Sequence, residues 1–109
     1  PESIAEDAGV DETAGVLEIG PGIGPLTQQL ALRANKVAAI ELDRDLLPIL
    51  GETMSAHPNV EIIPGDAMKL DLRELVTDKF SGLTPKACAN LPYNITTPII
   101  TKLLEAGCF

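Results

Sequence analysis

The chain has 109 residues, 45% of them apolar, which is enough for one small globular domain with a single core. Its formal net charge of −8 argues against binding a nucleic-acid backbone by charge alone. Its aromatic content of 3% argues against a nucleic-acid-binding module that stacks bases on aromatic side chains. The sequence has no apolar run of membrane-spanning length and no recognisable signal peptide, so we expect no membrane association and a cytoplasmic location.

Apolar runs alternate with amphipathic stretches along the chain, which predicts a parallel sheet built from right-handed strand–helix–strand units. The expected strands are residues 15–20, 36–42, 59–64 and 85–90. The expected helices are residues 24–34, 44–57, 70–78 and 97–107, with the tail of another at 3–9. Pro48 has to lie near the first turn of its helix, because a proline deeper in a helix lacks a needed N–H and clashes with the preceding turn.

The first strand leads into the glycine-rich sequence "EIGPGIGP". Gly20 permits a tight turn, and Gly22 lets a ligand approach the backbone. Gly24 and Pro25 open the next helix, whose free N–H groups form a positive end. The G-x-G-x-G spacing differs from the dinucleotide fingerprint and, with Glu18 two residues ahead, suits a nucleoside without a pyrophosphate, such as S-adenosylmethionine. The alternative is a turn that needs its glycines only for shape.

Acidic residues lie at or just after the ends of the second and third expected strands. Glu41 comes 21 positions after Gly20, close to the separation of about 20 at which a carboxylate binds ribose hydroxyls. Glu41 or Asp43 could instead cap the following helix, and we expect Asp43 to do so. Asp66 lies where it could accept a hydrogen bond from an adenine amino group, with the Ala67 N–H on a ring nitrogen; an ordinary turn aspartate is the alternative. These positions all fall at the carboxyl ends of strands, where open α/β sheets bind ligands.

The fourth strand runs into "NLPYNITTPII", which begins at Asn90. Asn-Leu-Pro-Tyr is similar to the (N/D)-x-P-(Y/F) signature of methyltransferases that modify amino groups conjugated to a ring or carbonyl. With "LEIGPGIGPLT", "IELDRDL" and "GDAMKLDL" before it, nearly the whole chain resembles the KsgA family of small-subunit ribosomal RNA adenine dimethyltransferases. The related Erm methyltransferases, which act on large-subunit RNA, typically carry Ser, Ile and Asp where this chain has Pro21, Leu91 and Pro98.

The resemblance implies a Rossmann-like, S-adenosylmethionine-dependent methyltransferase fold, with residues 1–109 as a partial catalytic domain holding about the first four strands. Family members add an N-terminal segment over the cofactor, later strands and a helical C-terminal domain that helps to grip RNA, so we expect this piece to be inactive alone. The implied reaction is dimethylation of N6 on adjacent adenines of small-subunit ribosomal RNA in the 30S pre-subunit, by a monomer without a metal ion.

Other functions stay open at this point. The chain could serve mainly as a ribosome-assembly or RNA-binding factor of the same family, or as an Erm-like large-subunit methyltransferase. Methylation of a DNA or protein amine is less favoured, because those enzymes more often carry Pro-Pro in the loop. The spacing of the glycines disfavours NAD-dependent oxidoreduction.

The acceptor site is expected at residues 90–93. The Asn90 side-chain oxygen and the Leu91 carbonyl would accept hydrogen bonds from the target amine and favour the tetrahedral geometry in which it attacks. Pro92 would stiffen the loop, and Tyr93 would stack on the base. The residues expected to contact the cofactor are Glu18, Gly20, Gly22, Gly24, Glu41, Leu42, Asp66, Ala67 and Asn90.

Overall fold

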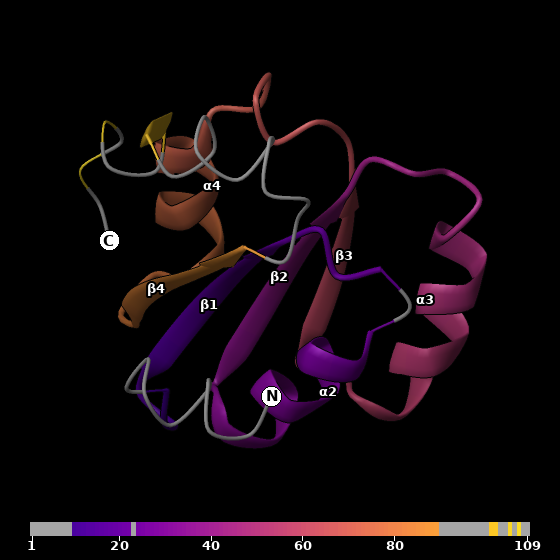
Figure 1. The fold of residues 1–109 in the computed structure, drawn as a ribbon. Coiled ribbons are helices and arrows are strands. Elements are labelled where there is room, and N and C mark those ends of the chain that lie inside the picture. The colour runs from indigo at the N-terminus through magenta and orange to yellow at the C-terminus, as the bar shows by residue number, and fades with distance from the viewer. Residues whose placement is uncertain (1–9, 23, 90–100, 103–104, 106, 108–109) are drawn as a thin grey trace.

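The computed structural model describes residues 10–22, 24–89, 101–102, 105 and 107. These residues form a four-stranded parallel sheet with the order β3-β2-β1-β4 (Figure 1). The strands are β1 (Ala14–Ile19), β2 (Lys36–Glu41), β3 (Val60–Pro64) and β4 (Thr84–Ala89). The helices are α2 (Pro25–Arg33), α3 (Leu47–Thr53), the 3-10 turn η1 (Met54–Ala56) and α4 (Leu72–Lys79). The predicted α/β fold with parallel strands is confirmed.

The central strand β1 is buried along its whole length, because its side chains alternate between two hydrophobic layers. On one face of the sheet, Val16 and Val37 pack against α2. The helix contributes Leu26 and Leu30, which lie one turn apart on the same side, and its C-cap residue Ala34 joins the same layer.

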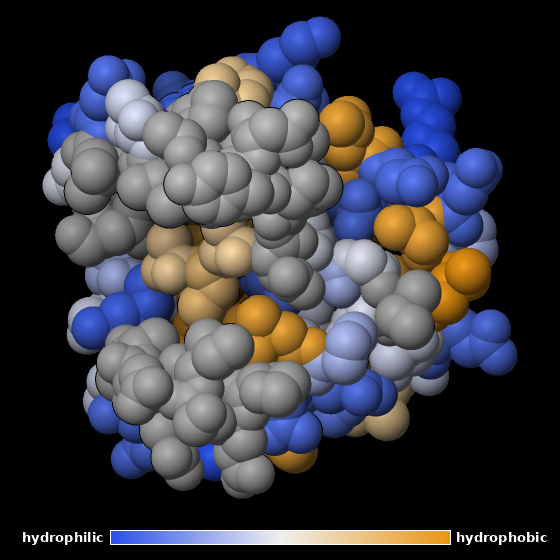
Figure 2. Space-filling view, in the orientation of Figure 1, coloured by the Kyte–Doolittle hydropathy of each residue, from blue (hydrophilic) through white to orange (hydrophobic). Residues whose placement is uncertain are grey.

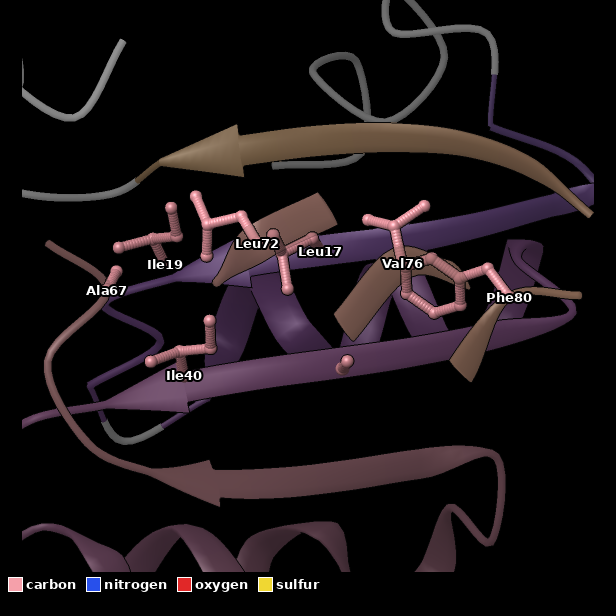
Figure 3. Close-up of a cluster of buried hydrophobic side chains, with 8 residues drawn as sticks. Leu17, Ile19, Ile40, Ala67, Leu72, Val76 and Phe80 are labelled. Carbon is pink, nitrogen blue, oxygen red and sulfur yellow. The ribbon is translucent and has the colours of Figure 1, made fainter. Parts of the chain in front are cut away.

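The second layer covers the opposite face of the sheet, where α4 packs on β1 and β2 (Figure 3). A methyl group on Gly15 of β1 would meet the Phe80 ring at 2.5 Å, so this close approach of helix and sheet requires a glycine. In Figure 3, Ala67 lies at the end of the layer toward which β1 and β2 point. Through Ala67, the loop after β3 therefore packs against the carboxyl edge of the sheet. Its members are Leu17, Ile19, Ala38, Ile40, Ala67, Leu72, Val76 and Phe80.

The structure corrects the prediction of one helix over residues 44–57, which is replaced by a turn, α3 and η1. The carbonyl oxygen of Asp43 accepts a hydrogen bond from the Leu46 N–H at 3.1 Å, and its Oδ1 accepts one from the Asp45 N–H at 2.9 Å. The N-cap of α3 is Leu46, which makes no side-chain cap, so the prediction that Asp43 caps this helix is wrong. Its carboxylate closes the preceding turn instead. Pro48 lies in the first turn, as predicted.

The other predicted elements that the structure describes begin and end within two residues of their expected positions. Helix α4 starts after Asp71, whose Oδ1 accepts a hydrogen bond from the Glu74 N–H at 3.1 Å. The predicted helix tail at 3–9 lies outside the described residues. Of the helix predicted at 97–107, the described residues 101, 102 and 105 are helical. Within the described ranges, no helix has the length and hydropathy to cross a membrane.

Candidate cofactor site

The loop between β1 and α2 contains three glycines with positive φ, of 76° at Gly20, 63° at Gly22 and 100° at Gly24. Gly24 is the N-cap of α2 and Pro25 lies in its first turn, as predicted. At Gly24 the positive φ strains any side chain, and a methyl group there would also meet the flexible end of Met54 at 2.7 Å. A methyl group on Gly22 would meet no heavy atom within 4 Å. The backbone at Gly22 therefore borders open space, which a ligand could enter.

Glu41 links this glycine loop to the loop after β2. Its Oε1 accepts a hydrogen bond from the Gly22 N–H at 3.0 Å, and its Oε2 accepts one from the Asp43 N–H at 2.9 Å. The side chain is buried, with 6% of its surface exposed. Each carboxylate oxygen keeps a further lone pair, so the oriented carboxylate could still accept hydrogen bonds from ribose hydroxyls. Glu41 does not cap α3, whose N-cap is Leu46.

Glu18 is fully buried near the end of β1. Its Oε1 accepts a hydrogen bond from the Thr27 hydroxyl of α2, and its Oε2 has no partner among the described residues. Burial raises the pKa of Glu18 to about 7; the Thr27 hydrogen bond opposes this rise, and the charge of Glu41 adds to it. Carboxyl groups with strongly shifted pKa values are common at functional sites, and structural hydrogen-bond or ion-pair networks produce such shifts as well. A contact between Glu18 and a cofactor stays a prediction.

Sequence reasoning did not identify Thr27 as part of this network. Its only local signal is that it comes three residues after Gly24, on the first turn of α2. Thr27 is fully buried, and the helix directs its hydroxyl to Glu18. Among the described residues, Thr27 thus supplies the one hydrogen bond to this carboxyl group.

Asp66 shapes the loop between β3 and α4, where the sequence placed an adenine-binding pair. Its Oδ1 accepts a hydrogen bond from the Met68 N–H at 2.9 Å, so one carboxylate oxygen stabilises the turn. The Gly65 N–H donates to the Glu41 carbonyl oxygen at 3.0 Å, which holds the start of the loop against the end of β2. Ala67 is buried in the hydrophobic layer beneath α4. The adenine contacts of Asp66 and Ala67 stay predictions.

Leu42 directly follows Glu41 and is 65% exposed. Met68, in the loop after β3, is 44% exposed. Figure 2 shows hydrophobic surface between hydrophilic residues on the side of the molecule where α3 lies. Leu42 is therefore available to a ligand, and its predicted cofactor contact stays a prediction.

The carboxyl ends of the strands meet in the upper middle of Figure 1, where the glycine loop leaves β1. Glu41 is the last residue of β2, and it pairs with Pro64, the last residue of β3. On the other side of β1, Ile19 pairs with Ala89 of β4. Three of the four predicted sites are thus brought to one edge. The fourth, residues 90–93, lies outside the described residues and follows Ala89 directly in the sequence.

Two surface hollows, of about 790 and 450 Å³, lie beside α4. Among the described residues that line them, none is one that the sequence predicted to bind the cofactor. Their linings include acidic and exposed side chains of α4 rather than the glycine loop, so we place no chemistry there. In the part of the chain that the structure describes, no group of three His, Cys, Asp or Glu side chains could hold a metal ion.

The chain is similar over most of its length to solved methyltransferase structures. The 23S rRNA methyltransferase ErmE is 34% identical with a TM-score of 0.78, and the match covers 98% of this chain and 41% of ErmE. A dimethyladenosine transferase from Plasmodium falciparum is 31% identical with a TM-score of 0.72, over 95% of this chain and 35% of that one. The fold is therefore that of the Rossmann-like methyltransferases.

The family model for ribosomal RNA adenine dimethylases matches residues 2–109. Ribosomal RNA small subunit methyltransferase A of Alkaliphilus oremlandii is 53% identical over 95% of this chain. The chain belongs to the ribosomal RNA adenine dimethylase family, as its motifs predicted. It spans 36% of the length of that relative.

Proposed function

We propose that the chain is the cofactor-binding part of a longer enzyme that uses S-adenosylmethionine to dimethylate N6 of adjacent adenines in small-subunit ribosomal RNA. The observation that carries this proposal is the meeting of the glycine loop, Glu41 and the Asp66 loop at one edge of the sheet. The 53% identity to a small-subunit methyltransferase, against 34% to ErmE, supports the small-subunit target over the large-subunit one.

The residues at this edge fit S-adenosylmethionine. Gly22 borders open space, so its backbone could lie against the ligand. The Glu41 carboxylate is already oriented by two backbone N–H groups for ribose hydroxyls. Asp66 uses Oδ1 for its own turn and would offer Oδ2 to the adenine amino group. When bound, the cofactor supplies an electrophilic methyl group on its sulfonium sulfur.

The sequence from Asn90 to Tyr93 would hold the methyl acceptor. The N6 amine of adenine is a poor nucleophile, because its lone pair is shared with the ring. The Asn90 side-chain oxygen and the Leu91 carbonyl oxygen would accept hydrogen bonds from the two N–H groups of this amine. These hydrogen bonds favour tetrahedral geometry at the nitrogen and offset its developing positive charge. Pro92 would restrain the loop, and Tyr93 would stack on the base. No general base is required, since the methylated ammonium is acidic and releases its proton to water.

Calorimetry with S-adenosylhomocysteine tests the cofactor part of the proposal. The full-length protein should bind it, and Glu41→Gln should weaken the affinity by about tenfold or more, because hydrogen bonds to a charged acceptor are worth about 1.5–3 kcal/mol each. Glu52→Gln is a matched control, since Glu52 is an exposed carboxylate of α3. Unchanged affinity in the Glu41 variant would refute the ribose role.

Mass spectrometry of ribosomal RNA tests the reaction. Unmodified 30S and 50S subunits are incubated with the full-length protein and S-adenosylmethionine, and dimethyladenosine is expected only in small-subunit RNA. Asn90→Ala should abolish methylation while leaving 30S binding nearly intact. Methylation of 50S RNA would favour the Erm-like alternative. Tight 30S binding without any methylation by the wild-type protein would favour a role in ribosome assembly.

We also propose that the RNA-binding surface lies mainly elsewhere in the longer protein, which would act as a cytoplasmic monomer on the 30S pre-subunit. The net charge of −8 supports this, because a phosphate backbone is bound by clusters of Lys and Arg. The 109-residue chain alone should therefore show no methylation in the same assay, and turnover by it would contradict this part of the proposal. Sedimentation of the full-length protein measures the oligomeric state.

A further inference from the structure

Lys102 contacts the backbone of the loop between β3 and α4. Its Nζ donates hydrogen bonds to the carbonyl oxygens of Ala67 and Leu70, both at 2.6 Å. The two carbonyls lie 35 and 32 residues before the lysine in the sequence, so this contact depends on tertiary structure. Hydrogen bonds from a charged donor at such short distances belong to the strong class.

The loop that Lys102 contacts is a single helical turn. The Asp66 carbonyl oxygen accepts hydrogen bonds from the Lys69 N–H at 2.9 Å and from the Leu70 N–H at 3.1 Å. A helical turn leaves its last carbonyls without partners inside the turn, and a cation is favourable at that end. Lys102 occupies this position. The turn is thus held from its start by Asp66 and from its end by the Lys102 ammonium.

The start of the loop is a glycine, which one hydrogen bond from its N–H to the Glu41 carbonyl oxygen holds against β2. Gly65 has a φ of 151°, in the region that side chains rarely adopt, and glycine has the widest range of backbone conformations. Met68, the middle residue of the turn, is 44% exposed. The fixed points of the loop are therefore the hydrogen bond from Gly65 to Glu41, the burial of Ala67, the turn of Asp66 and the contact from Lys102.

We propose that Lys102 is a positioning residue for the cofactor. It holds the Asp66–Leu70 turn in the shape in which the Asp66 carboxylate and the Ala67 N–H recognise the adenine ring. This inference rests on the proposed function of the loop. Lys102 acts through the backbone, so it affects recognition of the adenine end of the cofactor and leaves the glycine loop and Glu41 unchanged.

Two ligands separate this role from general stabilisation. In S-adenosylhomocysteine, the adenine amino group would donate a hydrogen bond to the Asp66 carboxylate. S-inosylhomocysteine carries an oxo group at that position instead. The full-length wild-type protein should bind the adenosyl ligand more tightly in calorimetry. Lys102→Met should weaken the adenosyl ligand about tenfold, the size expected for one lost hydrogen bond to a charged group, and the inosyl ligand much less. Lys69→Met, an exposed lysine in the same loop, is the matched control and should behave as wild type.

The deciding quantity is the ratio of the affinity for S-adenosylhomocysteine to the affinity for S-inosylhomocysteine. A Lys102→Met protein that is less stable but keeps the wild-type ratio would show that the contact is only structural and would overturn the proposal. If Lys102→Met does not fold, Lys102→Arg, which keeps the charge with a different geometry, should give a smaller ratio than wild type, and an unchanged ratio would overturn the proposal. Failure of the wild-type protein to bind S-adenosylhomocysteine would instead refute the proposed function.

Discussion

The buried carboxyl group of Glu18 predicts a pH-dependent stability that one substitution should remove. Burial raises the pKa of Glu18 from 4.5 to about 7, with the Thr27 hydrogen bond opposing the rise and the Glu41 charge adding to it. Glu18→Gln keeps the shape of the side chain and an oxygen that accepts from the Thr27 hydroxyl. The amide cannot ionise, so the variant removes the pH dependence and little else.

The sign follows from proton binding in the two states. Between pH 4.5 and pH 7, the native protein keeps the Glu18 proton while the unfolded chain has lost it, so native stability falls as the pH rises. Below this window both states are protonated, and above it the loss of stability is complete. A rise of the pKa from 4.5 to about 7 corresponds to about 3 kcal/mol, since one pKa unit is worth about 1.4 kcal/mol.

Urea unfolding near pH 5 and near pH 8 measures this effect. Near pH 8, Glu18→Gln should be more stable than wild type by as much as about 3 kcal/mol, and most of this gain should disappear near pH 5. Glu52→Gln, at an exposed position of α3, should follow the wild-type pH dependence. The reasoning is refuted if Glu18→Gln differs from wild type by the same amount at both pH values, or is less stable near pH 8.

Two further substitutions test the packing that positions the site. Gly15→Ala places a methyl group 2.5 Å from the Phe80 ring and should lower the free energy of unfolding by about 1–3 kcal/mol. Adding Phe80→Leu should restore part of this stability, and a double variant without any restoration would contradict the contact. Asn59→Ala removes the hydrogen bonds from Asn59 Nδ2 to the carbonyl oxygens of Ala31 and Ala34, at 2.9 and 3.2 Å, and should cost about 1–2 kcal/mol in urea unfolding. Asn59→Asp has a similar size without the donor and should cost as much, so a neutral Asn59→Asp variant would contradict this account.

The strands could be predicted because each is an apolar run bounded by residues that favour turns, and such patterns are local. The start of α3 could not, because Asp43 is equally suited to capping a helix and to closing a turn. Its Oδ1 accepts from the Asp45 N–H, and the helix begins beyond Leu46. Local propensity is compatible with both roles, and in the loop after β2 the turn is the one that forms.

The candidate site divides in the same way. The meeting of Gly22, Glu41 and Asp66 could be predicted from spacing, because each lies at or just after the end of a strand and parallel strands end at a common edge. Thr27 and Lys102 could not be assigned, because a threonine in a helix and a lysine near a chain end have many ordinary roles. Their contacts reach Glu18 and the loop after β3 only after α2 and the helical residues near 102 have packed in place.

The sequence by itself determined the alternation of strands and helices, the glycine loop, the acids after the strands and the family, since all of these are patterns of neighbouring residues. The tertiary structure alone decided that β4 pairs with β1 rather than with β3, in the order β3-β2-β1-β4. It also decided that Glu18 is buried with a raised pKa and that Lys102 reaches the Asp66 loop. Strand pairing, burial and long-range hydrogen bonds depend on which distant residues meet, and that is settled by the packing of the whole core.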